Sequence, residues 1–122
     1  MNYQNELLVV TRYIGLTFAQ KSFLSDLKEY ERLKLRSGSI FIWKTESILK
    51  QMDKDKTKLE RTQRVQVKIK EKNPAYRTYY WSTKKGSGEL TKSVQELANL
   101  TESVINEYWN NPDIEIEQRG WY

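Results

Sequence analysis

TESILKQMDKDKTKLERTQRVQVKIK, residues 45–70, carries basic side chains at short intervals and changes its hydrophobic period part-way along. Ile48 and Met52 recur at helical spacing, which predicts a helix over residues 46–52. From Val65 onward, apolar and polar residues alternate strictly, which is typical of a strand with one buried face. The stretch therefore predicts a change from helix to strand within one basic segment.

The tripeptide DKD at residues 53–55 is interpreted as a turn between two helices. Asp55 is a good N-cap for a further helix over residues 56–64, because its carboxylate can accept from the free amides of the first turn and complements the helix dipole. Residues 71–74 (EKNP) have turn composition, and residues 76–82 (YRTYYWS) predict a returning strand. The predicted order is helix, turn, basic helix and antiparallel hairpin.

The segment before this stretch is expected to contain an N-terminal arm, a helix and a brief strand. Residues 1–15 include ELLVVTRYI and are interpreted as a strand or arm. The pattern that follows predicts a helix ending near Gly38, with Thr17 and Gln20 as a capping box. Residues 39–44 (SIFIWK) are β-branched and aromatic, which favours a short strand.

The segment after the hairpin is expected to be a linker and an acidic unit. Residues 84–92 contain KKGSG, which is typical of a flexible linker. In residues 93–122, Ser93 and Glu96 predict a capping box, and Asn110-Asn111-Pro112 ends the helical pattern. One amphipathic helix is the simplest interpretation, two helices in a second helix-turn-helix-like unit are the alternative, and DIEIEQRGWY at the end predicts a terminal strand.

Charge is distributed unevenly along the 122 residues, which are enough for one domain with a modest core. The net charge is +5. Residues 50–85 hold twelve Lys or Arg and four Asp or Glu, about +8, whereas residues 86–122 hold two and seven, about −5. A positive block of this density is the electrostatic footprint of a nucleic-acid binder.

Several functional classes are excluded or disfavoured by composition. Cysteine and histidine are both absent, which removes disulfides, thiol nucleophiles, the usual zinc sites and the commonest general base. The sequence KKGSGEL lacks the rest of a phosphate loop, and the Asp53 and Asp55 pair suits a turn and a cap better than a metal. A non-catalytic protein without cofactor or metal is expected. The run Leu7–Val10 is too short for a signal peptide or a membrane span, so a cytoplasmic location is expected.

Leu49, Asp53, Leu59 and Thr62 stand at the offsets of the helix-turn-helix pattern, and residues 16–82 resemble the winged-helix DNA-binding domains of plasmid replication initiators and related bacterial regulators. The layout is also similar to that of TraN, the double-stranded-DNA-binding accessory proteins of conjugative type IV secretion in Gram-positive hosts. These resemblances imply an α+β, winged helix-turn-helix fold over residues 16–83 and a role in transfer, replication or regulation.

The recognition helix and wing would carry the DNA contacts. Lysines there would contact phosphate as point charges, whereas Arg61 or Arg64 could read guanine bidentately. Wing lysines would set affinity and salt dependence more than sequence choice. The predicted DNA-binding residues are Lys54, Lys56, Thr57, Lys58, Arg61, Arg64, Lys68, Lys70, Lys72 and Arg77.

Three alternatives remain open from the sequence. The aromatic run with Tyr76, Tyr79, Tyr80 and Trp81 could stack on single-stranded bases, although strand aromatics more often pack in a core. Residues 93–122 could bind a protein partner, as an inhibitor with an acidic surface would. The basic segment could also be no more than a solvated face. The oligomeric state is not indicated.

Overall fold

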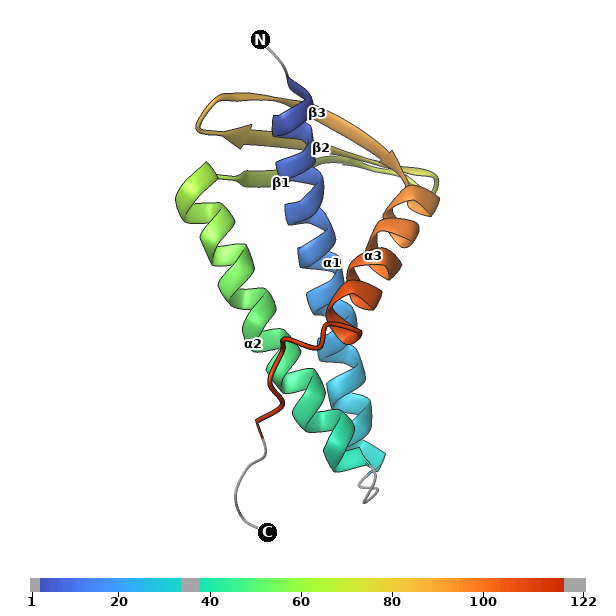
Figure 1. Ribbon diagram of the computed structural model, residues 1–122. Coiled ribbons are helices and arrows are strands. Elements are labelled where there is room, and N and C mark those ends of the chain that lie inside the picture. The colour runs from blue at the N-terminus through green and yellow to red at the C-terminus, as the bar shows by residue number, and fades with distance from the viewer. Residues whose placement is uncertain (1–2, 34–37, 118–122) are drawn as a thin grey trace.

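The computed structural model describes residues 3–33 and 38–117 and shows an α+β fold, as the sequence predicts (Figure 1). Within these residues it contains three helices and one antiparallel sheet of strand order β1-β2-β3. The elements are α1 (Tyr3–Leu33), α2 (Gly38–Gln63), β1 (Gln66–Lys72), β2 (Tyr76–Thr83), β3 (Gly86–Ser93) and α3 (Val94–Trp109). The sheet lies across the end of the helices where α1 begins and α2 ends, and α3 runs back along α1.

Helix α1 includes residues 3–15 of the segment that was predicted as an N-terminal strand or arm, so that prediction is wrong over these residues, and residues 1–2 lie outside the described residues. The reason is that α1 packs against α2, α3 and the sheet together, so its apolar residues lie around the helix instead of along one face. Val10 and Ile14 join the cluster under the sheet, whereas Phe23 joins the core between the helices. Thr17 is not a cap, because it lies within the helix and its hydroxyl donates to the carbonyl of Tyr13 at 2.9 Å.

Helix α2 is continuous through the predicted turn at residues 53–55, so no helix-turn-helix bend interrupts it. The tripeptide contains no glycine or proline, and each of its residues is compatible with a helix. Asp55 does not cap a new helix, because its carboxylate accepts instead from the Tyr108 hydroxyl and from the Gln51 amide. The separate helix predicted over residues 56–64 is therefore the second half of α2.

The strand predicted over residues 39–44 is wrong, because these residues form the first turns of α2. Their aromatic side chains pack between helices: the Phe41 ring lies 5.6 Å from that of Tyr30 and 6.2 Å from that of Trp109, centre to centre. Trp43 is buried in the next turn. Tertiary packing thus outweighs the local preference of β-branched and aromatic residues for strands.

The β1–β2 hairpin is confirmed, and the predicted linker after it is instead strand β3. Tyr79 and Trp81 point from β2 into the cluster beneath the sheet. Gly88 faces Trp81 across the β2–β3 ladder, and a Cβ at Gly88 would meet the indole ring at 3.0 Å. The glycine therefore makes room for a buried tryptophan, which is the packing reason that a linker-like composition forms a strand.

Helix α3 confirms the capping box and the single amphipathic helix, and the two-helix alternative is wrong. The Ser93 hydroxyl accepts from the Glu96 amide at 3.0 Å, and the Glu96 carboxylate accepts from the Ser93 amide at 3.1 Å. The terminal strand is wrong over residues 113–117, which run as irregular backbone along α2, and residues 118–122 lie outside the described residues. Ile114 packs on the helical core there, which takes the place of strand pairing.

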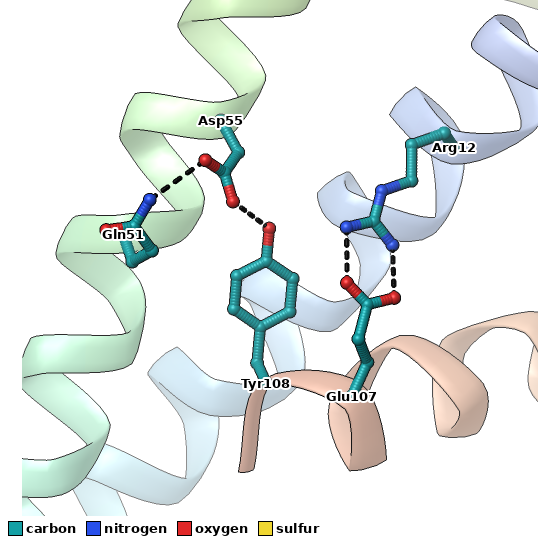
Figure 2. A network of polar contacts seen from close by, with 5 residues as sticks. All are labelled: Arg12, Gln51, Asp55, Glu107 and Tyr108. Atoms are coloured by element: carbon teal, nitrogen blue, oxygen red, sulfur yellow. Dashed lines mark hydrogen bonds and ion pairs between the residues drawn. The ribbon is translucent and has the colours of Figure 1, made fainter. Parts of the chain in front are cut away.

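A polar network ties α3 to both other helices (Figure 2). The buried Tyr108 donates its hydroxyl to Asp55 of α2. The Arg12 guanidinium of α1 donates to both carboxylate oxygens of Glu107 at 2.6 and 2.5 Å. Burial and then the bond to Asp55 raise the pKa of Tyr108 well above its ordinary value. The network thus links the C-terminal end of α3 to α1 and to α2.

Tyr108→Phe is expected to remove part of the alkaline instability of the fold. Because the folded-state pKa of Tyr108 is raised, its contribution to stability is complete below the unfolded pKa of about 10 and is lost as pH rises further. The wild-type free energy of unfolding should therefore fall more steeply above pH 10 than that of the variant, by up to about 1.4 kcal/mol per pH unit. Urea titrations at several pH values measure both slopes, and parallel curves would contradict the assignment.

Candidate nucleic-acid interface and cation groove

The structure divides the predicted DNA-binding residues between two surfaces. Lys54, Thr57, Lys58 and Arg61 recur every three or four residues, so they share one face of α2, and they line a shallow surface depression. This set of four is the α2 stripe. The three cations are exposed, and none forms an ion pair with a carboxylate of the described residues. The stripe is thus a row of cations without ion pairs, and Asp53 is the one carboxylate among the described residues that line its depression.

The acidic segment, residues 113–117, lies beside the stripe. The Glu117 carboxylate pairs with Lys50 at 3.0 Å, and its backbone amide donates to the Ser47 hydroxyl at 3.1 Å. The bond to Lys50 lowers the pKa of Glu117. Asp113 and Glu115 line the same depression as Lys54, so the acidic segment borders the first cation of the stripe.

The chain between α2 and the hairpin carries three further predicted residues. Arg64 follows the helix with φ of 52°, in the left-handed region, and turns the chain into β1. Lys68 is exposed and its backbone pairs with Tyr80. Lys70 is compensated, because it pairs with Glu89 at 2.7 Å, and this bond raises the pKa of Lys70. Of these three predicted residues, Arg64 and Lys68 are therefore the two that form no ion pair with a described carboxylate.

The remaining predicted residues, Lys56, Lys72 and Arg77, line a different surface together with Lys21 of α1. This cation groove lies between α1, α2 and the sheet and has a volume of about 460 Å³. None of the described residues that line it is a carboxylate. At 100° per residue, Lys56 lies about 200° around α2 from the stripe cations next to it, so the groove and the stripe face different directions.

A β-bulge places Lys72 in the groove. The register of the β1–β2 ladder shifts between Ile69 and Glu71, so that Lys72 pairs with Arg77 on the same sheet face as the Ile69 and Tyr79 pair. Strict alternation would put Lys72 on the other face, with Lys68. Like charges placed directly opposite each other destabilise a sheet. The bulge therefore brings two cations together at an energetic cost that a bound anion would offset.

Aromatic rings form part of the groove wall. The Lys56 ammonium lies 5.0 Å from the centre of the Tyr13 ring, and the Lys21 ammonium lies 5.5 Å from that of Phe18. Such contacts hold a cation in place and leave its charge available. Burial and the nearby Glu60 raise the pKa of Tyr13, so its hydroxyl stays protonated as a donor well into the alkaline range.

Sequence reasoning missed the part of the groove that α1 supplies. Tyr13, Phe18 and Lys21 are separated by five and three residues, and only the second spacing is typical of one helix face. They lie in a segment that was assigned to an arm and to an ordinary helix. The available signal was the pair Phe18 and Lys21, three residues apart on one helix face. It becomes informative only once α1 is known to pass under the sheet.

The four hairpin aromatics divide by face, as alternation along a strand requires. Tyr79 and Trp81 are buried, whereas Tyr76 and Tyr80 are about half exposed on the outer face of the sheet. The Lys70 ammonium lies 5.3 Å from the centre of the Tyr80 ring. Two of the four rings are thus buried in the core, which leaves only Tyr76 and Tyr80 of the four for base stacking.

The comparisons with known proteins identify one family. In the part of the chain that the structure describes, no helix is long and apolar enough to span a membrane. No curated protein and no solved structure matches the chain. The family model described as YhjD protein matches residues 1–113, a span that includes α1, α2, the sheet and α3. The chain therefore belongs to the YhjD protein family.

Proposed function

We propose that this protein is a non-catalytic double-stranded-DNA-binding protein that contacts the duplex through the α2 stripe and the adjoining hairpin. The observation that carries the proposal is the row of exposed cations at Lys54, Lys58 and Arg61, free of ion pairs with the described carboxylates. Arg12 and Lys50 are paired with carboxylates, whereas the cations of the stripe, like those of the cation groove, are not. A row of cations without ion pairs can bind the regularly spaced phosphates of a nucleic acid.

The shape of the stripe favours a duplex. Lys54 and Arg61 are seven residues apart, about 10 Å along the helix axis, which corresponds to about three base pairs. The exposed end of an α-helix fits the width of the major groove. Arg61 is placed to donate two hydrogen bonds to guanine, whereas the lysines suit phosphates.

The hairpin supports the role of a wing. Lys68 lies on its outer face and Arg64 at its base, so both extend the positive surface from the end of α2. The proposal keeps the recognition helix and the wing of the winged-helix resemblance and omits the helix-turn-helix bend. The resemblance also motivates an accessory or regulatory role in conjugative transfer or plasmid replication as the biological setting.

Fluorescence anisotropy of a labelled random duplex and of one of its strands tests the proposal. At low salt the duplex is expected to bind more tightly than the single strand, and the logarithm of the association constant is expected to fall linearly with the logarithm of salt concentration. Tighter binding of the single strand would favour stacking on Tyr76 and Tyr80. Absence of duplex binding by the folded protein at low salt would overturn the proposal.

Neutralising the acidic segment is expected to strengthen duplex binding. Glu115→Gln with Glu117→Gln removes negative charge next to Lys50 and Lys54, so about a 3- to 10-fold gain in duplex affinity is expected at low salt. The control variant, Glu31→Gln with Glu102→Gln, makes the same change in net charge at exposed carboxylates of α1 and α3. Equal gains in both variants would show an effect of net charge alone and contradict a local role of the acidic segment.

A further inference from the structure

The cation groove is a second binding site whose chemistry differs from that of the stripe. It is lined by residues of α1, α2 and the sheet, whereas the depression at the stripe is lined by residues of α2 alone. Its volume of about 460 Å³ is within the range of small-molecule sites, which extends from about 300 to 1,000 Å³. A site of this size takes a ligand about as large as a mononucleotide.

The groove already contains the recognition elements of a phosphate. Lys72 and Arg77 face the groove from adjacent strands, and Lys21 and Lys56 approach it from two helices. None of these four cations pairs with a carboxylate of the described residues. Arg77 is held by the backbone carbonyls of Asn73 and Tyr76, so its guanidinium is fixed before any ligand arrives. Preorganised cations bind a multiply charged group without the cost of ordering them.

The rest of the groove is apolar and aromatic, which an inorganic anion alone would not use. Ile14, Val67 and Ile69 supply aliphatic surface, and Tyr13 and Phe18 supply rings. Aromatic side chains of this kind pack against the planar ring of a nucleobase. The combination of four cations with an apolar wall is the pattern expected for an organic phosphate.

We propose that the cation groove binds a small phosphorylated molecule of nucleotide size, with its phosphates on Lys72 and Arg77 and its apolar ring against Tyr13 and Phe18. This inference is independent of duplex binding, because it concerns a different face of α2. It also accounts for the like charges that the β-bulge places opposite each other, since the phosphates would neutralise them.

Isothermal titration calorimetry with ATP, GTP, pyrophosphate and adenosine tests the proposal on the full chain. ATP or GTP is expected to bind more tightly than pyrophosphate, and pyrophosphate more tightly than adenosine. Lys72→Gln with Arg77→Gln is expected to weaken nucleotide binding at least about 10-fold, as the loss of two charge-assisted contacts requires. The matched control, Lys54→Gln with Lys58→Gln, removes the same charge from the stripe and should leave nucleotide binding unchanged.

Melting temperatures separate loss of the site from loss of the fold. The Lys72 and Arg77 variant loses a like-charge pair and also the bonds from Arg77 to the carbonyls of Asn73 and Tyr76, so without ligand it is expected to stay folded, with a melting temperature close to that of the wild type. ATP should raise the melting temperature of the wild type and of the stripe control, but not that of the groove variant. The proposal would be overturned if ATP, GTP and pyrophosphate all failed to bind at 1 mM. It would also be overturned if the groove variant bound nucleotide as tightly as the wild type, or if only the stripe control lost nucleotide binding. A groove variant that loses duplex binding while the wild type binds no nucleotide would assign the groove to the DNA backbone and also overturn it.

Discussion

Replacing Lys54, Lys58 and Arg61 with glutamine is expected to lower the affinity for duplex DNA about 100-fold at 0.1 M salt. Each cation that neutralises a phosphate releases a counterion, and three such contacts change the slope of log affinity against log salt by about 2.7. The three side chains are exposed and without ion pairs to the described carboxylates, so the variant should keep its fold. Anisotropy titrations at several salt concentrations give both the affinity and the slope.

The control for this variant removes the same charge from the other surface. Lys21→Gln, Lys72→Gln and Arg77→Gln together lower the net charge by as much as the stripe substitutions do, but at the cation groove. Duplex affinity should fall far less in this control than in the stripe variant, because a duplex on the stripe lies on a different face of α2. Equal losses in the two triple variants would mean that net charge alone drives binding.

Phe23→Ala is expected to lower the free energy of unfolding by about 3 to 5 kcal/mol, the range for an aromatic side chain removed from a core. Phe23 is 2% exposed, lies between α1 and α2 with Ile48 and Met52, and stacks on Trp109 with ring centres 6.4 Å apart. Because small domains are stable by only about 5 to 15 kcal/mol, this loss is a large share of the total. Urea unfolding followed by tryptophan fluorescence measures it.

The neighbouring residue provides the control. Leu24 is 47% exposed on the same helix, so Leu24→Ala should change the free energy of unfolding by less than about 1 kcal/mol. The two residues are adjacent in sequence and both apolar, so only the orientation of α1 separates them. Comparable losses in the two variants would contradict the packing of α1 between α2 and α3.

Periodicity predicted the elements that have a single buried face. One face of the helix after Ser93 packs on the core, and so does one face of the hairpin with Val67 and Tyr79. Their apolar residues therefore recur at the period of a helix or of a strand, which the sequence shows directly. The capping box at Ser93 and Glu96 fixed the start of α3, because its bonds are local in sequence. The capping box at Thr17 and Gln20 depends equally on neighbouring residues, but it was wrong, because α1 begins earlier and continues through both.

The errors lie where packing on several sides decides the structure. Helix α1 contacts two helices and the sheet, which removes its amphipathic period, so its first turns resembled a strand. Asp55 was interpreted as a cap, whereas its partner, Tyr108, is 53 residues away along the chain. Gly88 was interpreted as part of a linker, because the space that it leaves for Trp81 becomes apparent only once the pairing of β2 with β3 is known. No local pattern encodes these long-range contacts.

The candidate sites show the same division. The stripe could be predicted, since Lys54, Lys58 and Arg61 follow a helical period in the sequence. The groove could not be predicted. Lys72 faces it only because a β-bulge shifts the strand register, and Lys21 lies in a helix about fifty residues earlier in the chain. A basic block in a sequence therefore predicted positive surface, while its division into two faces required the fold.

Amide chemical-shift mapping during a titration with duplex DNA is the most direct test of the central claim that the stripe and hairpin bind DNA. The largest shifts are expected in residues 54–64 of α2 and its end and around Lys68 of β1, with small shifts in α3. Such a footprint would place the duplex along the stripe. Shifts confined to α3 and the acidic segment, or no shifts at duplex concentrations above that of the protein, would contradict the claim.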